Sequence, residues 1–309
     1  MADLKDIKYL KHKDINLELW DQAIANSLNG LVYGYSWFLN AMADEQWDAL
    51  VYKNYEAVFP LVNKKKYGIP FLHQPYFCQQ LGLFSTFEIS EEFLHLFLQK
   101  IPSKFKYWNF HLNYRNVFPL NILKPKKRTT FQINLNQSYT EIYDHYNSDA
   151  KKNLAKAEIT GFDVRKNLDV ELVAHTFFEV YGQHYARPTK LQQQITNCAQ
   201  EAIKLNKGFT KGIYGKDGQL WCAGFFLKAN NTIHYAMAAP TAQGKKYGAT
   251  HILIDEILKE FAMQNMIFDF EGSDINSVAY FYSKFGSNSI HYLEINVNKL
   301  PRWCRWLKK

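Results

Sequence analysis

The sequence predicts an α+β protein of two lobes, each a mixed, mostly antiparallel sheet flanked by helices. Short runs rich in β-branched and aromatic residues follow one another at turn-length spacing, and amphipathic helical stretches lie between them. A chain of 309 residues with 47% hydrophobic content can fill two cores. We place the lobes at residues 1–127 and 128–309, because residues 124–128 combine a proline with consecutive basic side chains.

Each element of the first lobe has a local signal. Apolar residues at helical spacing mark the two opening helices, and Lys53-Asn54 separates two strand-like runs as a hairpin turn. Ser90-Glu91-Glu92 is a typical start of a helix. In chain order we expect helices over residues 17–28 and 36–42, strands over 47–52, 55–62 and 69–73, a helix over 90–98 and a strand over 105–112.

The second lobe opens with a strand, after which Ser148-Asp149 starts a helix and Gly161 ends it. A three-stranded meander, a helix and a further strand follow, and this strand–helix–strand step predicts parallel pairing. We expect strands over residues 129–135, 209–214, 221–228, 233–239 and 266–270, and helices over 148–160, 170–185, 188–205 and 247–263.

Composition limits the classes of protein that this chain can represent. The formal net charge of +8 favours anionic partners such as phosphate esters, nucleic acid or anionic lipid, although solvated lysines also serve solubility. Cys78, Cys198, Cys222 and Cys304 form no metal-ligand spacing, so we expect no metal and no disulfide framework. Without a signal sequence or an apolar run long enough to span a bilayer, we expect a cytoplasmic protein with no transmembrane segment.

A Gly/Lys loop between the strand at residues 233–239 and the following helix is the first candidate site. Backbone N–H groups at a helix start, with lysines beside them, can bind the phosphates of a carrier. The alternative is a glycine turn with solvated lysines. The candidate donor-binding residues are Met237, Ala238, Ala239, Gly244, Lys245, Lys246, Gly248, Ala249 and Thr250.

The order of meander, Gly-containing loop at a helix start, parallel strand and final aromatic-Gly helix resembles the GNAT N-acetyltransferase superfamily. Three segments resemble its two-lobed branch, the Fem-type aminoacyltransferases and their FemAB-like relatives. The basic helix of residues 147–158 passes into a strand at residues 161–165. Asp269-Phe270-Glu271-Gly272-Ser273 and Phe281-Tyr282-Ser283-Lys284-Phe285-Gly286 are similar to the Asp-Phe-Gly-Gly and Phe-Lys-x-x-Phe-Gly signatures.

The resemblance implies two GNAT-like lobes, a donor site in the C-terminal lobe, and direct attack of an amine on an activated acyl group. Glu271 stands where the family has its second glycine, and Tyr282 stands where it has lysine. Tyrosine here is similar to the general acid of many acyl-CoA-dependent GNAT enzymes. The donor implied is therefore acyl-CoA, such as acetyl-CoA.

Direct attack requires groups that accept and donate protons. Tyr282 is the candidate acid, with packing beside Phe281 and Phe285 as the alternative. Glu271 or Asp269 is the candidate base, if burial raises the pKa of the carboxylate, and capping of the next turn is the alternative for Asp269. For the acceptor amine, the resemblance implies a loop contributing His184, Tyr185 and Arg187, and we add Ser273. A structural role is the alternative for His184.

The resulting prediction is a GNAT-type N-acyltransferase acting on a small-molecule or cell-wall-precursor amine. One alternative is Fem-type transfer from aminoacyl-tRNA to a peptidoglycan precursor, which would make tRNA a partner. The other alternative is a protein that has lost turnover and only binds its ligand.

Overall fold

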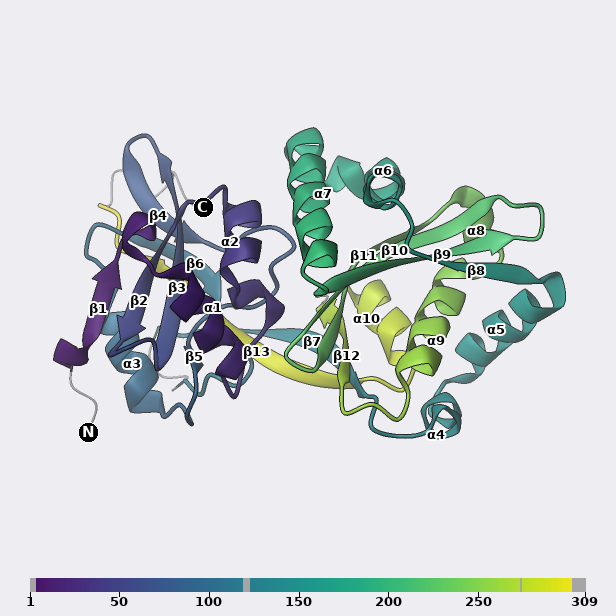
Figure 1. The fold of residues 1–309 in the computed structure, drawn as a ribbon, viewed down its shortest axis with the longest axis horizontal. Coiled ribbons are helices and arrows are strands. Elements are labelled where there is room, and N and C mark those ends of the chain that lie inside the picture. The colour runs from purple at the N-terminus through teal and green to yellow at the C-terminus, as the bar shows by residue number, and fades with distance from the viewer. Residues whose placement is uncertain (1–3, 119–122, 273, 302–309) are drawn as a thin grey trace. The chain divides into compact units, whose positions relative to one another are not determined.

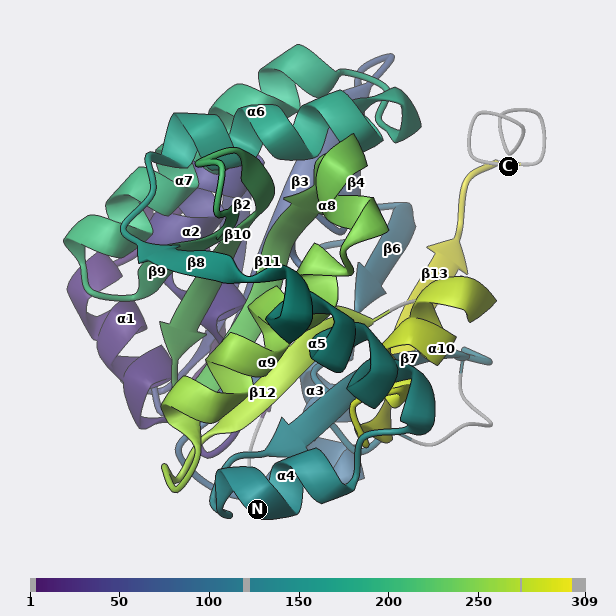
Figure 2. The same cartoon turned by 90° about the vertical axis from the view of Figure 1, so that its right-hand side faces the viewer.

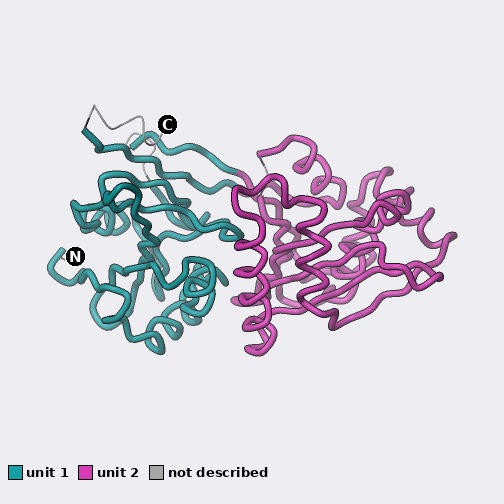
Figure 3. Tube along the Cα trace, turned by 90° about the horizontal axis from the view of Figure 1, so that it is seen from above, with its two compact units in different colours: residues 1–128, 291–309 teal, residues 129–290 magenta. Residues whose placement is uncertain are grey.

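The computed structural model describes residues 4–118, 123–272 and 274–301. The chain forms two compact units (Figure 3): the first runs to Arg128 and takes up the chain again from His291, and the second is Thr129–Ile290. The predicted lobes placed the segment from His291 in the second half, whereas the structure groups it with the first.

Unit 1 is built on a sheet with the strand order β1-β2-β3-β4-β6-β13, and β5 pairs with β3. Strands β4 and β6 are parallel, and the other neighbours are antiparallel. Its elements are β1 (Ile7–Leu10), α1 (Leu17–Asn26), α2 (Ser36–Ala43), β2 (Trp47–Tyr52), β3 (Ala57–Lys66), β4 (Ile69–His73), β5 (Phe84–Ser85), α3 (Glu91–Lys100), β6 (Tyr107–His111) and, crossing from unit 2, β13 (Asn288–Asn298).

Local chemistry explains why these elements begin where they do. Asn16 accepts hydrogen bonds from the first amides of α1, and Ser90 does the same for α3. The core of the unit contains stacked and edge-on rings, among them Phe59, Phe97 and Phe110.

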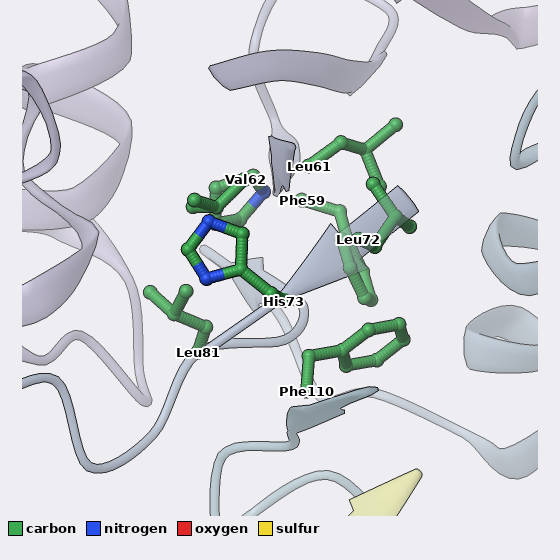
Figure 4. Close-up of a pocket in the computed structure, with 8 residues that line it drawn as sticks. Phe59, Leu61, Val62, Leu72, His73, Leu81 and Phe110 are labelled. Carbon is green, nitrogen blue, oxygen red and sulfur yellow. The ribbon is translucent and has the colours of Figure 1, made fainter. Parts of the chain in front are cut away.

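A small pocket in unit 1 lies beside His73 (Figure 4). It has a volume of about 10 Å³ and is lined mainly by apolar side chains of β3, β4 and β6. This is about the space of one water molecule, so the pocket has no room for a small-molecule ligand. Nearby, Gln74 bonds to the Cys78 carbonyl and to the His111 amide, and Gln80 accepts from the Tyr114 amide. Gln74 and Gln80 therefore stabilise the segment that follows β4.

Unit 2 is built on a sheet with the strand order β7-β12-β11-β10-β9-β8, in which β11 and β12 are parallel. The other neighbours are antiparallel. Its elements are β7 (Lys126–Asn134, entering from unit 1), α4 (Tyr139–Asp144), α5 (Ser148–Thr160), β8 (Phe162–Lys166), α6 (Val170–Tyr181), α7 (Pro188–Lys204), β9 (Gly208–Gly215), β10 (Leu220–Ala229), β11 (Thr232–Pro240), α8 (Ala242–Lys246), α9 (Ala249–Phe261), β12 (Ile267–Gly272) and α10 (Asn276–Ser283).

Helices cover both faces of the unit-2 sheet (Figures 1 and 2). Helices α6 and α7 lie on one face, and α5, α9 and α10 lie on the other. Ile133, Ile233 and Phe268 occupy neighbouring positions of β7, β11 and β12 and pack into the α9 core. Because side chains alternate along a strand, the adjacent polar positions face the opposite side.

The predicted fold class is confirmed, and the parallel pairing of the strands around residues 233–239 and 266–270 is present. Three features differ. Residues 126–128 begin β7 rather than interrupting regular structure, since the exposed end of a strand tolerates Lys126 and Lys127. A capped helix, α8, occupies part of the expected loop. Helix α4 and strands β1, β5 and β13 were not predicted.

A buried carboxylate fixes α4 and the connection between α4 and α5 against α9, which gives the first testable prediction. Asp255 is 9% exposed and accepts hydrogen bonds from the hydroxyl groups of Tyr139 and Tyr146, at 2.9 Å and 3.0 Å. We expect Tyr146→Phe to lower the free energy of unfolding by about 1–2 kcal/mol, because a buried acceptor loses a donor. Urea denaturation measures this loss.

Tyr143→Phe is the matched control, since the Tyr143 ring packs between the other two rings and its hydroxyl is not a donor to Asp255. An equal loss of stability in both variants would show that the hydrogen bond to Asp255 contributes nothing.

Candidate functional site

Strands β11 and β12 separate after a short stretch of pairing. They pair at Thr232, Ile233 and His234, opposite Ile267, Phe268 and Asp269, whereas β11 stays paired with β10 as far as Pro240. Along the described residues, the β12 side of β11 therefore has no strand partner beyond His234. Thr241 donates its amide to Trp221 O of β10. Because amides alternate along a strand, the Ala238 amide faces the side on which the strands separate.

The N-terminus of α9 follows directly from this strand. Gly248 has a left-handed backbone (φ 66°) and precedes Ala249, the first residue of the helix. The amides of Ala249 and Thr250 have no acceptor within the helix, as at any helix start. The amides of Tyr247 and Gly248 donate hydrogen bonds to carbonyl groups of α8. Ala249 and Thr250 are therefore the amides of this loop that remain as candidate donors to a ligand.

The remaining donor-site candidates divide into exposed and buried groups. Lys245 and Lys246 are exposed, as binding to an anion requires. Gly244 is buried, and a Cβ there would lie 1.8 Å from Trp221 O. The side chains of Met237, Ala238 and Ala239 are also buried, so at these three positions a donor would contact the main chain.

Helix α5 adds basic side chains beside this loop. Lys156 Nζ donates to Lys246 O at 3.2 Å, and Asn153 lies against Gly248, where a Cβ would be 3.1 Å from Asn153 Oδ1. The basic helix that carries the Fem-type resemblance thus lies next to the Gly/Lys loop.

Tyr282 of α10 lies among aromatic rings near the point where the strands separate. Its ring is 6.3 Å from that of Tyr235 on β11 and 4.9 Å from that of Phe270 on β12. Burial, and then the charge of Glu271, raises the pKa of Tyr282 above its ordinary value. The phenol therefore stays protonated at neutral pH and can donate a hydrogen bond or a proton. Its ring also packs against the neighbouring aromatic rings.

Asp269 is fully engaged with its neighbours. It is 1% exposed and accepts hydrogen bonds from Thr130 Oγ1 (2.5 Å), Gln132 Nε2 (2.8 Å) and the Glu271 amide (2.8 Å). Burial raises the pKa of this carboxyl, and the hydrogen bonds act in the opposite direction. Because both oxygens are occupied, the geometry gives Asp269 an anchoring role and leaves Glu271 as the candidate base.

Glu271 has a backbone conformation that usually belongs to glycine. Its φ is 64°, and the Asp269 carboxylate stabilises this turn by accepting its amide. The side chain is 19% exposed, and Oε1 lies 3.6 Å from His234 Nδ1. Burial lowers the pKa of His234 to about 3, so the imidazole is neutral. Glycine would adopt this φ without strain, which agrees with the glycine that the sequence resemblance predicts at this position.

Comparison with solved structures supports the fold. The chain superposes on FemX with a TM-score of 0.70 at 10% identity, covering 98% of this chain and 100% of FemX. The chain has a two-lobed, GNAT-like fold of the FemX type. It also superposes on L-PGS of Bacillus licheniformis (TM-score 0.54, 11% identity, 93% of each chain) and on Saccharomyces cerevisiae N-myristoyltransferase with bound myristoyl-CoA (0.51, 13%, 96% and 84%). No protein-family model and no curated protein matches the sequence.

The residues expected from the sequence to bind the acceptor amine lie in the turn between α6 and α7. His184 and Arg187 are exposed, and Tyr185 packs against Phe178 with ring centroids 5.6 Å apart. Tyr181, at the start of this turn, contributes to the raised pKa of Tyr282, so the turn approaches α10. Ser273 lies outside the described residues.

Several residues of the site were not predicted from the sequence. His234 and the Thr130–Gln132–Asp269 group form a polar row on the face of the sheet opposite α9. The sequence carried a signal for the two β7 residues, because the polar Thr130 and Gln132 alternate with the apolar Phe131 and Ile133. Cys222 is also near, and its thiol bonds to Thr250.

Three further observations concern the described part of the chain. It contains no group of three or more His, Cys, Asp or Glu side chains that could hold a metal ion. None of its helices combines the length and apolar character that crossing a bilayer requires. Cys78, Cys198 and Cys222 are buried free thiols, and Cys304 lies outside it.

The buried neutral His234 predicts a specific loss of stability in acid. Its pKa is lowered in the folded state, so the unfolded chain binds the proton first and stability falls as the pH drops below about 6.5. Between pH 7 and pH 5 we expect His234 to account for about 2 kcal/mol of this loss. Urea titrations of His234→Gln should show a correspondingly smaller difference between the two pH values.

His175→Gln, on an exposed position of α6, is the control and should retain the pH dependence of the unchanged protein. If His234→Gln loses stability toward pH 5 as steeply as this control, His234 is not the group that takes up the proton.

Proposed function

We propose that this protein transfers an acyl group from acyl-CoA, or from a similarly activated donor, to an amine. The observation that carries the proposal is the separation of β11 and β12 beside the N-terminus of α9, with Tyr282 nearby. A phosphorylated carrier would contact the amides of Ala249 and Thr250, whose helix dipole favours negative charge.

The donor's extended arm would follow the unpaired side of β11. There the Ala238 amide can donate to a carbonyl group of the arm, as a strand would. This main-chain contact needs no particular side chain, which agrees with the buried small residues of the strand. Lys245, and Lys246 beside Lys156, would add positive charge at the phosphate end.

The chemical step needs a proton acceptor and a proton donor close together. In the proposed step the amine nitrogen attacks the acyl carbonyl carbon, and Glu271 takes the amine proton directly or through water. The carbon–sulfur bond then breaks, and the leaving thiolate takes a proton from Tyr282. The acyl group ends on the nitrogen as an amide, and no covalent enzyme intermediate forms.

Aminoacyl transfer from tRNA is the second candidate, and a specific observation favours it. The FemX superposition covers nearly the whole of both chains, and basic α5 lies against the donor loop. A tRNA donor would make binding fall steeply with salt, because neutralised phosphates release counterions. A cell-wall-precursor amine would then be the acceptor. Free CoA esters would leave the protein's thermal stability unchanged.

Substitution of the residues that are proposed to bind the donor tests the leading proposal. We expect a saturating acyl-CoA to raise the melting temperature by several degrees, and Lys245→Glu combined with Gly248→Asp to abolish the rise. The aspartate adds negative charge at the helix start, and the glutamate replaces an attractive charge by a repulsive one. Differential scanning fluorimetry with and without the ester measures both.

Lys204→Glu, an equal charge reversal at the exposed end of α7, is the control and should keep the full rise. The proposal fails if acyl-CoA esters leave the melting curve of the unchanged protein where it was, or if all variants respond equally.

The assignment of acid and base predicts two distinguishable defects. Tyr282→Phe should lower kcat about 100-fold with little change in KM, and Glu271→Gln should lower it similarly at neutral pH. Only the glutamine variant should recover as the pH rises, since the free amine then needs no base. Steady-state kinetics over a pH series measure this.

Tyr280→Phe, at an exposed position of the same helix, is the control for α10 and should retain full activity. Equal activity of Tyr282→Phe and Tyr280→Phe would assign Tyr282 to packing.

A further inference from the structure

A second charged pocket lies in unit 2, at the far end of α9 from the proposed donor site. It has a volume of about 270 Å³ and is lined by residues of β8, β9, β10 and the last turn of α9. Helix α9 has 13 residues, so its two ends are separated by about 20 Å. We call this site the lysine pocket, after its lining residues Lys166, Lys211 and Lys228.

One carboxylate in the lysine pocket serves two of the three ammonium groups. Glu260 Oε2 lies 2.6 Å from Lys211 Nζ, and Glu260 Oε1 lies 2.7 Å from Lys166 Nζ. The Lys211 side chain is 2% exposed and also donates to Glu256 O at 3.1 Å. Burial acts to raise the pKa of Glu260, but the hydrogen bonds and charges of Lys166 and Lys211 together outweigh it, so the pKa is lowered and the carboxylate is ionised.

Lys228 supplies a third positive charge without a matching carboxylate among the residues that line the pocket. Its Nζ lies 5.7 Å from the centre of the Phe261 ring. Three ammonium groups therefore face one carboxylate, which leaves an excess of two positive charges in a recess. Lys211 is buried, whereas the Lys166 side chain is 60% exposed, and a bound dianion would offset the repulsion among these like charges.

The other walls of the lysine pocket set the size and type of ligand. Phe209 and Phe261 lie 5.5 Å apart, centre to centre, and provide an apolar side. The volume is below that of sites for drug-sized ligands, so a compact anion fits best. Ammonium groups act as point charges toward phosphate.

We propose that the lysine pocket binds a small dianionic phosphate, as the free ion or as a monoester. This site is independent of the proposed acyl transfer, since it uses none of the residues of the donor site. Its occupation would bridge β8, β10 and the C-terminal end of α9.

Isothermal titration calorimetry at constant ionic strength tests the lysine pocket, with inorganic phosphate and glycerol phosphate as probes. We expect saturable binding of one or both, weakened about tenfold by Lys228→Gln and by Lys166→Gln, since each removes one charge-assisted contact. Binding of glycerol phosphate should also weaken below about pH 6, where a phosphate monoester loses its second charge. Binding of inorganic phosphate alone would identify the free ion as the ligand, and tighter binding of glycerol phosphate would identify a monoester.

Two controls decide between outcomes. Lys216→Gln removes an exposed lysine that is paired with Asp163 outside the pocket, and should leave the affinity unchanged. Lys245→Glu combined with Gly248→Asp disables the proposed donor site and should also leave it unchanged. The proposal is overturned if neither probe binds, if Lys216→Gln weakens binding as much as Lys228→Gln, or if the donor-site variant abolishes it.

Discussion

The buried carboxylate of Asp269 determines the shape of the candidate site. It joins β7 to β12 through Thr130 and Gln132, and it accepts the amide of Glu271 two residues further on. The last of these bonds stabilises the left-handed backbone of Glu271, and the pairing of β12 with β7 shifts register between Asp269 and Gly272. Strand β12 therefore turns after Asp269, whereas β11 stays paired with β10 as far as Pro240 across a register shift between His234 and Met237, and the strands separate.

The separation of β11 from β12 costs free energy. Main-chain groups of β11 beyond His234 give up a strand partner on one side, and a polar group without a partner is unfavourable unless water or a ligand supplies one. A non-glycine residue with positive φ adds strain beside it. Both costs fall beside a helix N-terminus and a protonated Tyr282, and this coincidence supports the proposed binding of a donor through the main chain.

Sequence reasoning succeeded where the determinants are local. The period of α9, the hairpin turn at Lys53-Asn54 and the Ser90 cap of α3 depend on neighbouring residues, and the structure has these features as predicted. Capping of the next turn by Asp269 was an alternative that the sequence offered, and the bond from the Glu271 amide agrees with it. The bonds of Asp269 to Thr130 and Gln132 could not be predicted, because they depend on the register between β7 and β12, whose residues are 139 and 137 positions apart. The Glu271 substitution likewise became interpretable only when its φ was known.

Helix α9 links the two charged regions of unit 2 through its dipole. Its N-terminal amides favour an anion, and its C-terminal half, with Glu256 O and Glu260, favours the ammonium of Lys211. The helix dipole and the Glu260 carboxylate together stabilise the charge of one buried lysine, Lys211. They do not account for the additional charges of Lys166 and Lys228 around the same recess, and a structural ion pair would be complete without them. The excess charge is therefore the feature of the lysine pocket on which the proposed binding of a dianion rests.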